Sequence, residues 1–299
     1  MTSPLDPQLG MYSHVNGHPA DILDRLTISE LCKGWPVYRD ASEWKNFRSL
    51  FCQDAFVWTT WSKRQTIDSF IQVSKEGKSR GDFIMHRECG TCVDLNPQTR
   101  RAVGKMKATI TQRFAIPGDP ARGIEPVVFD VDCDCRFHFF CLEEQQPVGS
   151  DDSSDDDDEY AVGRRGPPQW KVRYVKLIYD KDKVVPVDGK TAPTFSKEAL
   201  RRCPEGYKYL GAAQRMLGHD VDEFLPTIQG PEKGAAHRLW LDMYEKMGRW
   251  LDGDDDIDLS SPVPSDKGFA NGNGRVHVNG NGNGNGNGSC NGFHVNSFH

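Results

Sequence analysis

An aspartate and a histidine in the first third of the chain are of the types that form a general acid–base pair. Asp40 stands in the segment 38–44 (YRDASEW), near the end of a predicted helix. His86 begins a predicted strand in the segment 82–86 (DFIMH), after a glycine-containing loop. A carboxylate bonded to one imidazole nitrogen fixes the tautomer and raises the basicity of the other nitrogen, which can then take a proton next to a carbonyl. A histidine at the start of a strand is also often a core residue, so the pair depends on the fold around it.

Helices and a strand in the first 80 residues should position Asp40. Apolar residues recur with helical spacing over 21–32, and Gly-Trp-Pro at 34–36 is predicted to interrupt that helix. A second helical piece covers 44–51. Residues 55–61 are β-branched and aromatic, which predicts a strand, and 66–76 predicts a short helix with Gly77 at its end.

The middle of the chain predicts the sheet that should position His86. Strands are predicted at 83–94, 101–116, 127–142 and 170–179. Within 101–116 the even positions are mostly apolar and the odd ones mostly polar, so one face should be buried. Early helices followed by long antiparallel strands predict an α+β fold, a cone-shaped curved sheet whose N-terminal helices enclose a pocket.

The outer segments differ in composition from this central domain, which we place at 19–189. Residues 1–18 predict a disordered lead, and the acidic segment 143–168 predicts a long loop between two paired strands. Residues 190–251 predict a helical extension, with helices at 196–202, 207–217 and 232–251. The apolar stripe of the last helix favours packing on the domain over a partner groove. The Asn/Gly-rich tail 252–299 predicts disorder.

Composition bounds the partners and the compartment. The net charge is −6 and no basic stripe stands out, so nucleic-acid binding is not favoured. There is no run of 18 apolar residues and no secretory leader, so we expect no membrane span. The nine cysteines are read as reduced thiols in a cytoplasmic protein.

Two cysteine pairs raise the question of a metal. Cys89 and Cys92 have C-x-x-C spacing, and Cys133 and Cys135 form a second close pair. The second pair lies inside a predicted strand rather than in a zinc knuckle, and its alternate spacing puts both side chains on one face. We therefore expect core cysteines and no metal.

Several segments in order along the chain carry a resemblance. They are 38–44, 51–55 (FCQDA), His86, 112–114 (QRF) and 170–172 (WKV). In these, residues 20–180 resemble the NTF2-like superfamily, in its SnoaL-like and scytalone dehydratase-like branch. The resemblance implies a cofactor-free pocket inside the cone. It places Asp40 where scytalone dehydratase has the aspartate that orients its catalytic histidine, and His86 where one catalytic histidine lies.

The departures from that enzyme suggest a different reaction. Its second catalytic histidine has no counterpart, since Gln112 or Thr111 stands there. The two tyrosines that hold a water correspond to Arg39 and Thr59. At two strand positions where scytalone dehydratase has serine and asparagine, this chain has Asp134 and Arg136. This chain therefore keeps the base and changes the electrophilic side of the pocket.

Two arginines could supply the changed part. Arg136 or Arg39 could stabilise an enolate or a departing oxygen through charge-assisted hydrogen bonds. Asp134 and Arg136 could equally be a surface ion pair, since they share one strand face. Gln112 lies on an otherwise apolar face, where a buried amide needs a partner.

These observations predict a cofactor-independent lyase or isomerase, that is a dehydratase, double-bond isomerase or cyclase. Its substrate would be a small hydrophobic, aromatic or polyketide- or terpenoid-like molecule of secondary metabolism, and a homodimer or homotrimer is expected. Asp40 and His86 would be catalytic. The pocket candidates are Arg39, Thr59, Trp61, Met106, Gln112, Asp134 and Arg136.

The alternative is a non-catalytic NTF2-like binding or dimerisation module. An enzyme needs Asp40 and His86 within hydrogen-bond reach and open to a cavity, whereas a module could have them apart or plugged by the C-terminal helices. A third reading makes 190–251 a lid over the mouth of the cone.

Overall fold

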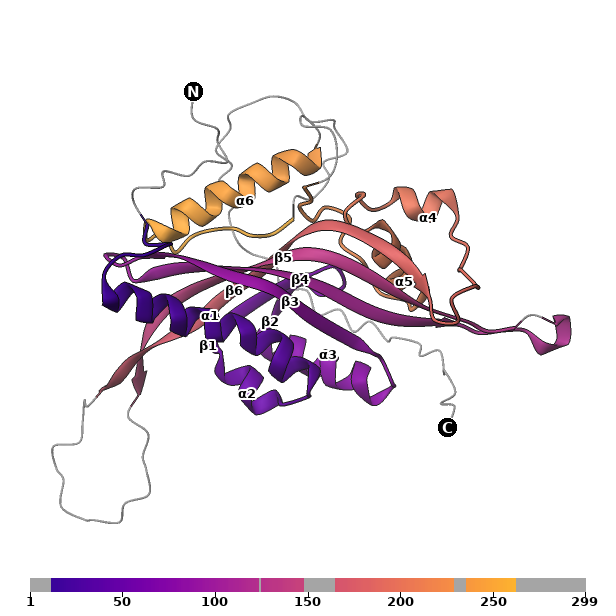
Figure 1. The fold of residues 1–299 in the computed structure, drawn as a ribbon, viewed down its shortest axis with the longest axis horizontal. Helices are drawn as coiled ribbons and strands as arrows, with labels where there is room; N and C mark the ends of the chain where they lie inside the picture. The colour runs from indigo at the N-terminus through magenta and orange to yellow at the C-terminus, as the bar shows by residue number, and fades with distance from the viewer. Residues whose placement is uncertain (1–11, 124, 148–164, 229–234, 262–299) are drawn as a thin grey trace, which may run out of the picture. The chain divides into compact units, whose positions relative to one another are not determined.

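A curved six-stranded sheet carries the fold (Figure 1). The computed structural model describes residues 12–123, 125–147, 165–228 and 235–261. The strand order is β2 (Lys63–Thr66), β1 (Phe51–Thr59), β6 (Arg165–Pro186), β5 (Val127–Pro147), β4 (Arg101–Ile116) and β3 (Ile84–Asn96). Neighbours pair antiparallel except β1 and β6, which are parallel. The α+β class with a curved, open sheet is confirmed.

The helices cover both faces of this sheet (Figure 1). The first face carries α1 (Pro19–Asp40), α2 (Trp44–Ser49) and α3 (Ile67–Ser79). The short turn η1 (Pro120–Arg122) links β4 to β5. The C-terminal part adds α4 (Lys197–Arg201), α5 (Lys208–Met216) and α6 (Ala235–Leu251), and α6 lies on the opposite face from α1.

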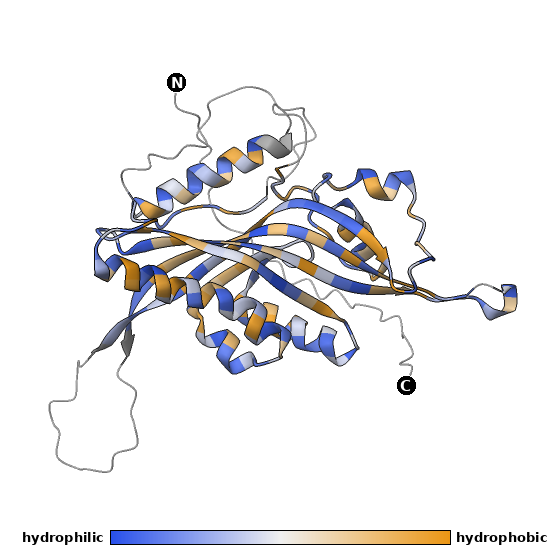
Figure 2. Cartoon of the chain, in the orientation of Figure 1, coloured by the Kyte–Doolittle hydropathy of each residue, from blue (hydrophilic) through white to orange (hydrophobic). Residues whose placement is uncertain are grey.

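The long strands alternate in burial as the sequence predicted, and Figure 2 shows the matching alternation of hydropathy. The strand predicted at 101–116 has these bounds in the structure. Most of its even residues, among them Ala102, Met106 and Ala108, are buried in the core on the α1 side of the sheet. Gly104 lies under α1, where a Cβ would overlap the Sγ of Cys32, so only glycine lets the helix approach this closely.

Helix α1 runs without a break through Pro36 to Asp40, so the predicted interruption at 34–36 is wrong. Proline in a helix interior removes one hydrogen bond and costs about 3 kcal/mol. Packing offsets that cost: Trp35 and Pro36 are buried, and the Trp35 ring lies 5.3 Å from the ring centroids of both Phe47 and Phe137. The unbroken helix carries Asp40 to the edge strand β3.

Two further local predictions need correction. The helical piece predicted at 44–51 ends at Ser49, because β1 already begins at Phe51. Gly77 lies inside α3, which ends at Ser79 and is followed by Gly81 at φ +93°. The short strand β2 was not predicted, because its four residues (KRQT) show no apolar alternation.

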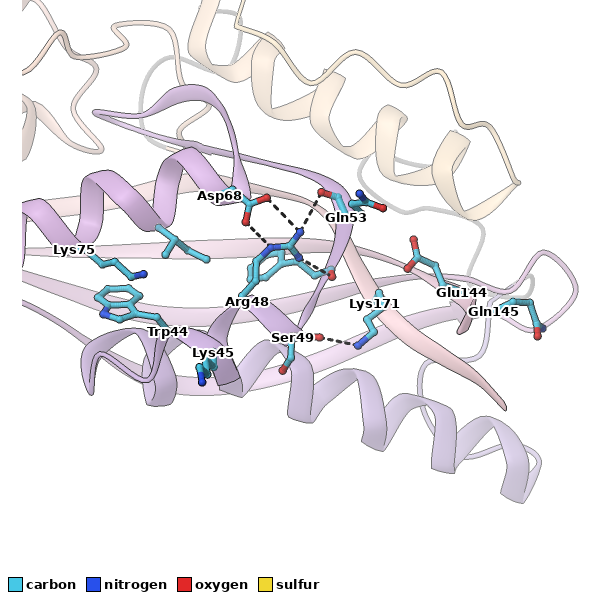
Figure 3. Close-up of a pocket in the computed structure, with 12 residues that line it drawn as sticks. Trp44, Lys45, Arg48, Ser49, Gln53, Asp68, Lys75, Glu144, Gln145 and Lys171 are labelled. Atoms are coloured by element: carbon cyan, nitrogen blue, oxygen red, sulfur yellow. Dashed lines mark hydrogen bonds and ion pairs between the residues drawn. The ribbon is translucent and has the colours of Figure 1, made fainter. Parts of the chain in front are cut away.

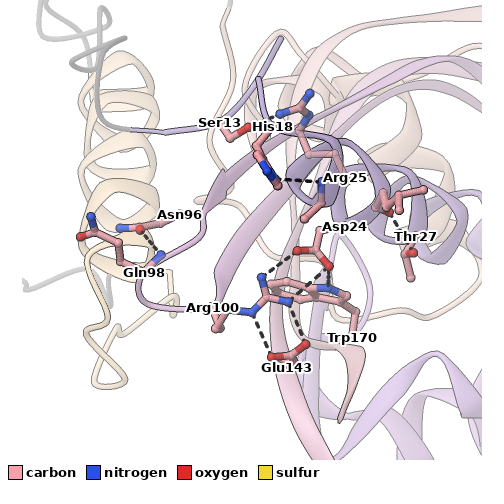
Figure 4. Close-up of polar contacts among 12 residues, drawn as sticks. Ser13, His18, Asp24, Arg25, Thr27, Asn96, Gln98, Arg100, Glu143 and Trp170 are labelled. Carbon is pink, nitrogen blue, oxygen red and sulfur yellow. Dashed lines mark hydrogen bonds and ion pairs between the residues drawn. The ribbon is translucent and has the colours of Figure 1, made fainter. Parts of the chain in front are cut away.

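A polar network fixes the N-terminal half of α1 to the sheet (Figure 4). Arg100, which follows the β3–β4 turn, donates to Asp24 of α1 at 2.7 Å and to Glu143 of β5 at 2.8 Å. The indole of Trp170 in β6 also donates to Asp24, at 2.8 Å. These charge-assisted bonds join α1 to the β3–β4 turn and to strands β5 and β6, and so set the register of α1 on the sheet.

The ordered region extends beyond two predicted boundaries. In the predicted lead, Ser13 and Leu95 of β3 exchange two backbone hydrogen bonds. After α6, Ile257 and Leu259 are buried although they fall in the predicted tail. The remaining parts of the lead and tail, 1–11 and 262–299, and most of the acidic loop, 148–164, lie outside the described residues. The strands that flank the acidic loop are paired, as predicted.

The apolar stripe of α6 packs on the sheet, which confirms the packing interpretation. Met243, Met247 and Trp250 are buried against residues of β4 and β5. The indole N–H of Trp250 donates to the backbone oxygen of Ala102 at 3.1 Å.

Candidate functional site

Asp40 and His86 are joined by two hydrogen bonds. The backbone N–H of His86 donates to Oδ2 of Asp40 at 2.6 Å, and its Nδ1 lies 2.8 Å from Oδ1. Because β3 is the edge strand, the N–H of His86 faces away from β4 and is free for the carboxylate at the end of α1. The carboxylate therefore fixes both the main chain and the ring.

The other ring nitrogen of His86 has a single donor. The indole N–H of Trp35 points to Nε2 at 3.4 Å. With a donor on Nε2, the ring proton resides on Nδ1 and is donated to Asp40. Nε2 therefore carries the lone pair that a general base needs, and its long bond from Trp35 is weak enough for a ligand to replace.

The pKa of His86 is lowered below the ordinary value of 6.5. Burial is the main cause, and the charges of Arg39 and Lys78 add to it, while the hydrogen bond to Asp40 acts in the opposite direction. Only 4% of the side chain is exposed. The imidazole is therefore neutral near pH 7, the protonation state of a base.

Arg39 brings a buried positive charge to the same place. The residue is 4% exposed, and its Nε and Nη1 have no hydrogen-bond partner. Its nearest carboxylate oxygen is Oδ1 of Asp40, 3.9 Å from Nη1 and already bonded to His86. Burial lowers the pKa of Arg39 to about 10, which leaves it charged at neutral pH.

The cavity beside this pair is small. Its volume is about 30 Å³, room for a water molecule or two. Residues of α1, β1, β3, β4, β5 and β6 line it, and α5 of the C-terminal extension closes it with Leu210 and Gln214. A second cavity of about 30 Å³ shares Arg39, Trp61 and Gln112 with the first and leads outward between α3 and His219.

The predicted pocket residues divide into two groups. Thr59, Trp61 and Gln112 line the cavity together with Arg39 and His86. Met106 faces the same side of the sheet but is fully buried in the core. The amide of Gln112 has the partner that a buried position requires, since Gln214 donates to its Oε1 at 2.9 Å.

Asp134 and Arg136 lie on the opposite face of the sheet, so they do not line the cavity. In β5 their neighbours Cys135 and Phe137 point into the core, and alternation sends these two side chains outward. Arg136 pairs with Asp180 at 3.2 Å, and Asp134 accepts from Thr109 at 2.6 Å. The two residues therefore lie on the surface but each pairs with another residue, so the ion pair between them that the sequence allowed is not formed, and Arg39 is the arginine at the site.

Sequence reasoning missed several residues that line the cavity, among them Trp35, Leu210 and Gln214. Trp35 lies one helical turn before Arg39 on the same face of α1, a spacing that could have marked it. Gln214 is the polar member of the buried run 210–214 in α5, while Leu210 gave no signal because an apolar residue is ordinary in a helix. Neither α5 residue falls within the family resemblance.

A larger groove, of about 650 Å³, lies away from this pair (Figure 3). Part of its charge is engaged: Arg48 donates to Asp68 at 2.7 Å, and Lys171 donates to the backbone of Ser49 at 2.7 Å. It holds no histidine or cysteine among its lining residues. The groove is large enough for a bound segment, but no carboxylate–imidazole pair lines it.

The described cysteines form no cluster with metal-ligand geometry. Cys133 and Cys135 are buried, and burial raises the pKa of both thiols well above the ordinary value. Cys89 and Cys92 are exposed on β3. Within the described ranges, no three His, Cys, Asp or Glu side chains converge as metal ligands. None of the described helices is both long and apolar enough to cross a membrane.

Comparison with known proteins agrees with the fold. Residues 20–136 match the model of a SnoaL-like domain. Pea pathogenicity protein 2 of Fusarium vanettenii is 42% identical over 240 residues, 80% of this chain and 90% of that protein. An uncharacterised protein of Emericella nidulans is 39% identical over 242 residues, with the same coverage. The chain belongs to the SnoaL-like family.

Solved structures resemble this SnoaL-like protein only distantly. A candidate scytalone dehydratase from Novosphingobium aromaticivorans is 14% identical with a TM-score of 0.36, over 55% of this chain and 88% of that one. Such a value carries no argument about chemistry, so the site of this SnoaL-like protein is interpreted from its own residues.

Proposed function

We propose that this SnoaL-like protein is a cofactor-independent lyase or isomerase, in which His86 is the general base and Asp40 orients it. The observation that carries the proposal is the Asp40–His86 pair, with its 2.8 Å bond and with Nε2 left as the lone-pair nitrogen. Such a base can remove a proton next to a carbonyl and return it to a departing oxygen or another carbon. Dehydration, double-bond shift and cyclisation share this transfer.

Arg39 would complete the site. A guanidinium with free N–H groups beside the base can bind the oxygen on which negative charge develops. Burying a charge without hydrogen bonds is costly, and so is burying an Asp–His pair. A module that only packs or dimerises has no need of either group, which is why we favour an enzyme.

The small cavity requires movement of α5. A substrate of polyketide size occupies several hundred Å³, far more than the 30 Å³ beside His86. Leu210 and Gln214 of α5 and Trp61 close this space, so they would move aside when the substrate enters. The hydrophobic substrate, the cytoplasmic location and a homodimer or homotrimer remain predictions from the sequence.

A product screen tests the proposal. The full chain is incubated with a panel of β-hydroxy carbonyl compounds and aromatic polyketide-like ketones, and ¹H NMR follows loss of water or movement of a double bond. We expect turnover by the wild type and by Arg136→Gln, whose side chain lies on the far face, and a loss of at least about 100-fold in His86→Gln. Equal turnover in His86→Gln would exclude His86 as the base.

The second candidate function is a non-catalytic binding module. The filled interior and the 650 Å³ groove in Figure 3 favour it. In that case, substitutions in the groove such as Lys75→Glu would abolish partner binding, while Asp40→Asn and His86→Gln would leave it unchanged.

A further inference from the structure

We propose that the substrate is a hydroxy acid, whose carboxylate binds Arg39 and whose hydroxyl group binds Gln214. This inference deepens the proposed function and rests on it for the reaction, but it makes its own claim about binding. Two buried polar groups line one cavity: one has hydrogen-bond donors without an acceptor, and the other has an acceptor without a donor.

The first group is the guanidinium of Arg39. Its Nε and Nη1 are buried donors without an acceptor, and it lines both small cavities. Its cation–π contacts, to Phe70 at 5.4 Å and Trp35 at 5.9 Å, provide no hydrogen-bond acceptor for these N–H groups. A carboxylate can accept a charge-assisted hydrogen bond from either of these N–H groups.

The neighbouring acids are already engaged. Both oxygens of Asp40 accept from His86. Asp82, at the outer cavity, lies 3.6 Å from Arg80. Lys78 donates to the backbone oxygen of Asp40. Arg39 therefore has an ion pair with Asp40 at 3.9 Å but no hydrogen-bonded anion. The outer cavity also carries Lys78, Arg80 and Asp82, so its cations outnumber its carboxylates and favour a negatively charged ligand.

The second group is the amide of Gln214 on α5. Its Nε2 donates to Gln112, while its Oε1 is buried and accepts nothing. A free acceptor needs a donor from the ligand, and a hydroxyl group is the smallest that fits. The cavity that holds both groups also contains His86. A β-hydroxy acid would thus place its carboxylate on Arg39, its hydroxyl on Gln214 and its α-carbon beside the base.

Small probes test this recognition without a known substrate. Glycolate carries both groups, glycolamide replaces the carboxylate with a neutral amide, and acetate lacks the hydroxyl. Binding is followed through the ¹³Cε1 shift of His86 at constant ionic strength. We expect glycolate to bind more tightly than acetate, and glycolamide to bind weakly or not at all.

Variants assign the two ends. Arg39→Gln should weaken glycolate and acetate alike by roughly 10- to 100-fold, because a charge-assisted hydrogen bond is lost. Gln214→Met should weaken glycolate to the level of acetate and leave acetate unchanged. Arg136→Gln is the matched control, and thermal unfolding of each variant verifies that it is folded.

The outcomes separate recognition from catalysis. If glycolate binds through Arg39 but no compound turns over, the hydroxy-acid site stands and the catalytic proposal fails. If neutral ketones turn over through His86 while Arg39→Gln retains full activity and glycolate does not bind, the catalytic proposal stands and the hydroxy-acid site is overturned. Equal glycolate binding by the wild type and Arg39→Gln also overturns it.

Discussion

Replacing Asp40 with asparagine should both destabilise the protein and change the tautomer of His86. The carboxylate accepts two bonds, from the His86 main chain at 2.6 Å and from Nδ1 at 2.8 Å. An asparagine side chain can accept only one of them and turns a donor toward the other. A hydrogen bond to a charged group contributes about 1.5–3 kcal/mol and the remaining bond becomes a neutral one, so we expect a loss of about 2–4 kcal/mol.

Urea unfolding and ¹⁵N NMR of the histidine ring measure the two effects. In the wild type the ring proton should reside on Nδ1, and in Asp40→Asn the Nε2–H tautomer should grow. Asp134→Asn is the matched control: this carboxylate also accepts a hydrogen bond but is 40% exposed, so its loss should cost within about 1 kcal/mol. If Asp40→Asn unfolds like the control and keeps the wild-type tautomer, the carboxylate does not hold the ring.

Three further predictions concern the same cavity. Arg39→Met should raise the free energy of unfolding by about 1–2 kcal/mol, because it removes a buried charge whose Nε and Nη1 lack hydrogen bonds. A lower free energy of unfolding in urea would contradict this prediction. Leu210→Ala should lower the free energy of unfolding by about 2–5 kcal/mol and speed the entry of glycolate, because the leucine side chain closes the cavity and alanine is too short to do so. An unchanged rate of glycolate binding in stopped-flow experiments would argue against α5 as the closing element. The pKa of His86 is lower in the folded protein than in the unfolded chain, where it is about 6.5. As the pH falls through 6.5, the unfolded chain therefore binds a proton at His86 before the folded protein does, and the free energy of unfolding decreases. The stability that neutral His86 contributes is thus present above pH 6.5 and lost as the pH falls below it. An NMR titration that gave a pKa above 6.5 for the ring would show that the hydrogen bond to Asp40 outweighs burial, contrary to this account.

The sequence predicted the long strands of the sheet well because apolar and polar residues alternate along most of their length. The strand 101–116 shows this best: its period of two both marked its bounds and told which face was buried. Gln112 could be singled out for the same reason, as a polar residue on an apolar face. The pair of Asp40 and His86 came from the family resemblance, and the structure brings the two together.

Other features depended on tertiary contacts that the sequence does not display. Proline usually ends a helix, and only the packing of Trp35 against Phe47 and Phe137 explains why α1 continues through Pro36. Arg136 was as good a candidate as Arg39 by residue type, and only the side of the sheet separates them. The closure of the cavity by Gln214 joins residues over a hundred positions apart, a contact that no local pattern predicts.

Solvent exchange tests the central claim that His86 removes a carbon-bound proton. The full chain is incubated in D₂O with a carbonyl compound that the product screen shows to bind, and ¹H NMR follows its α-proton signal. The account predicts stereospecific loss of that signal with the wild type and with Arg136→Gln, and loss at the rate without protein for His86→Gln. Exchange by His86→Gln at the wild-type rate would contradict the account.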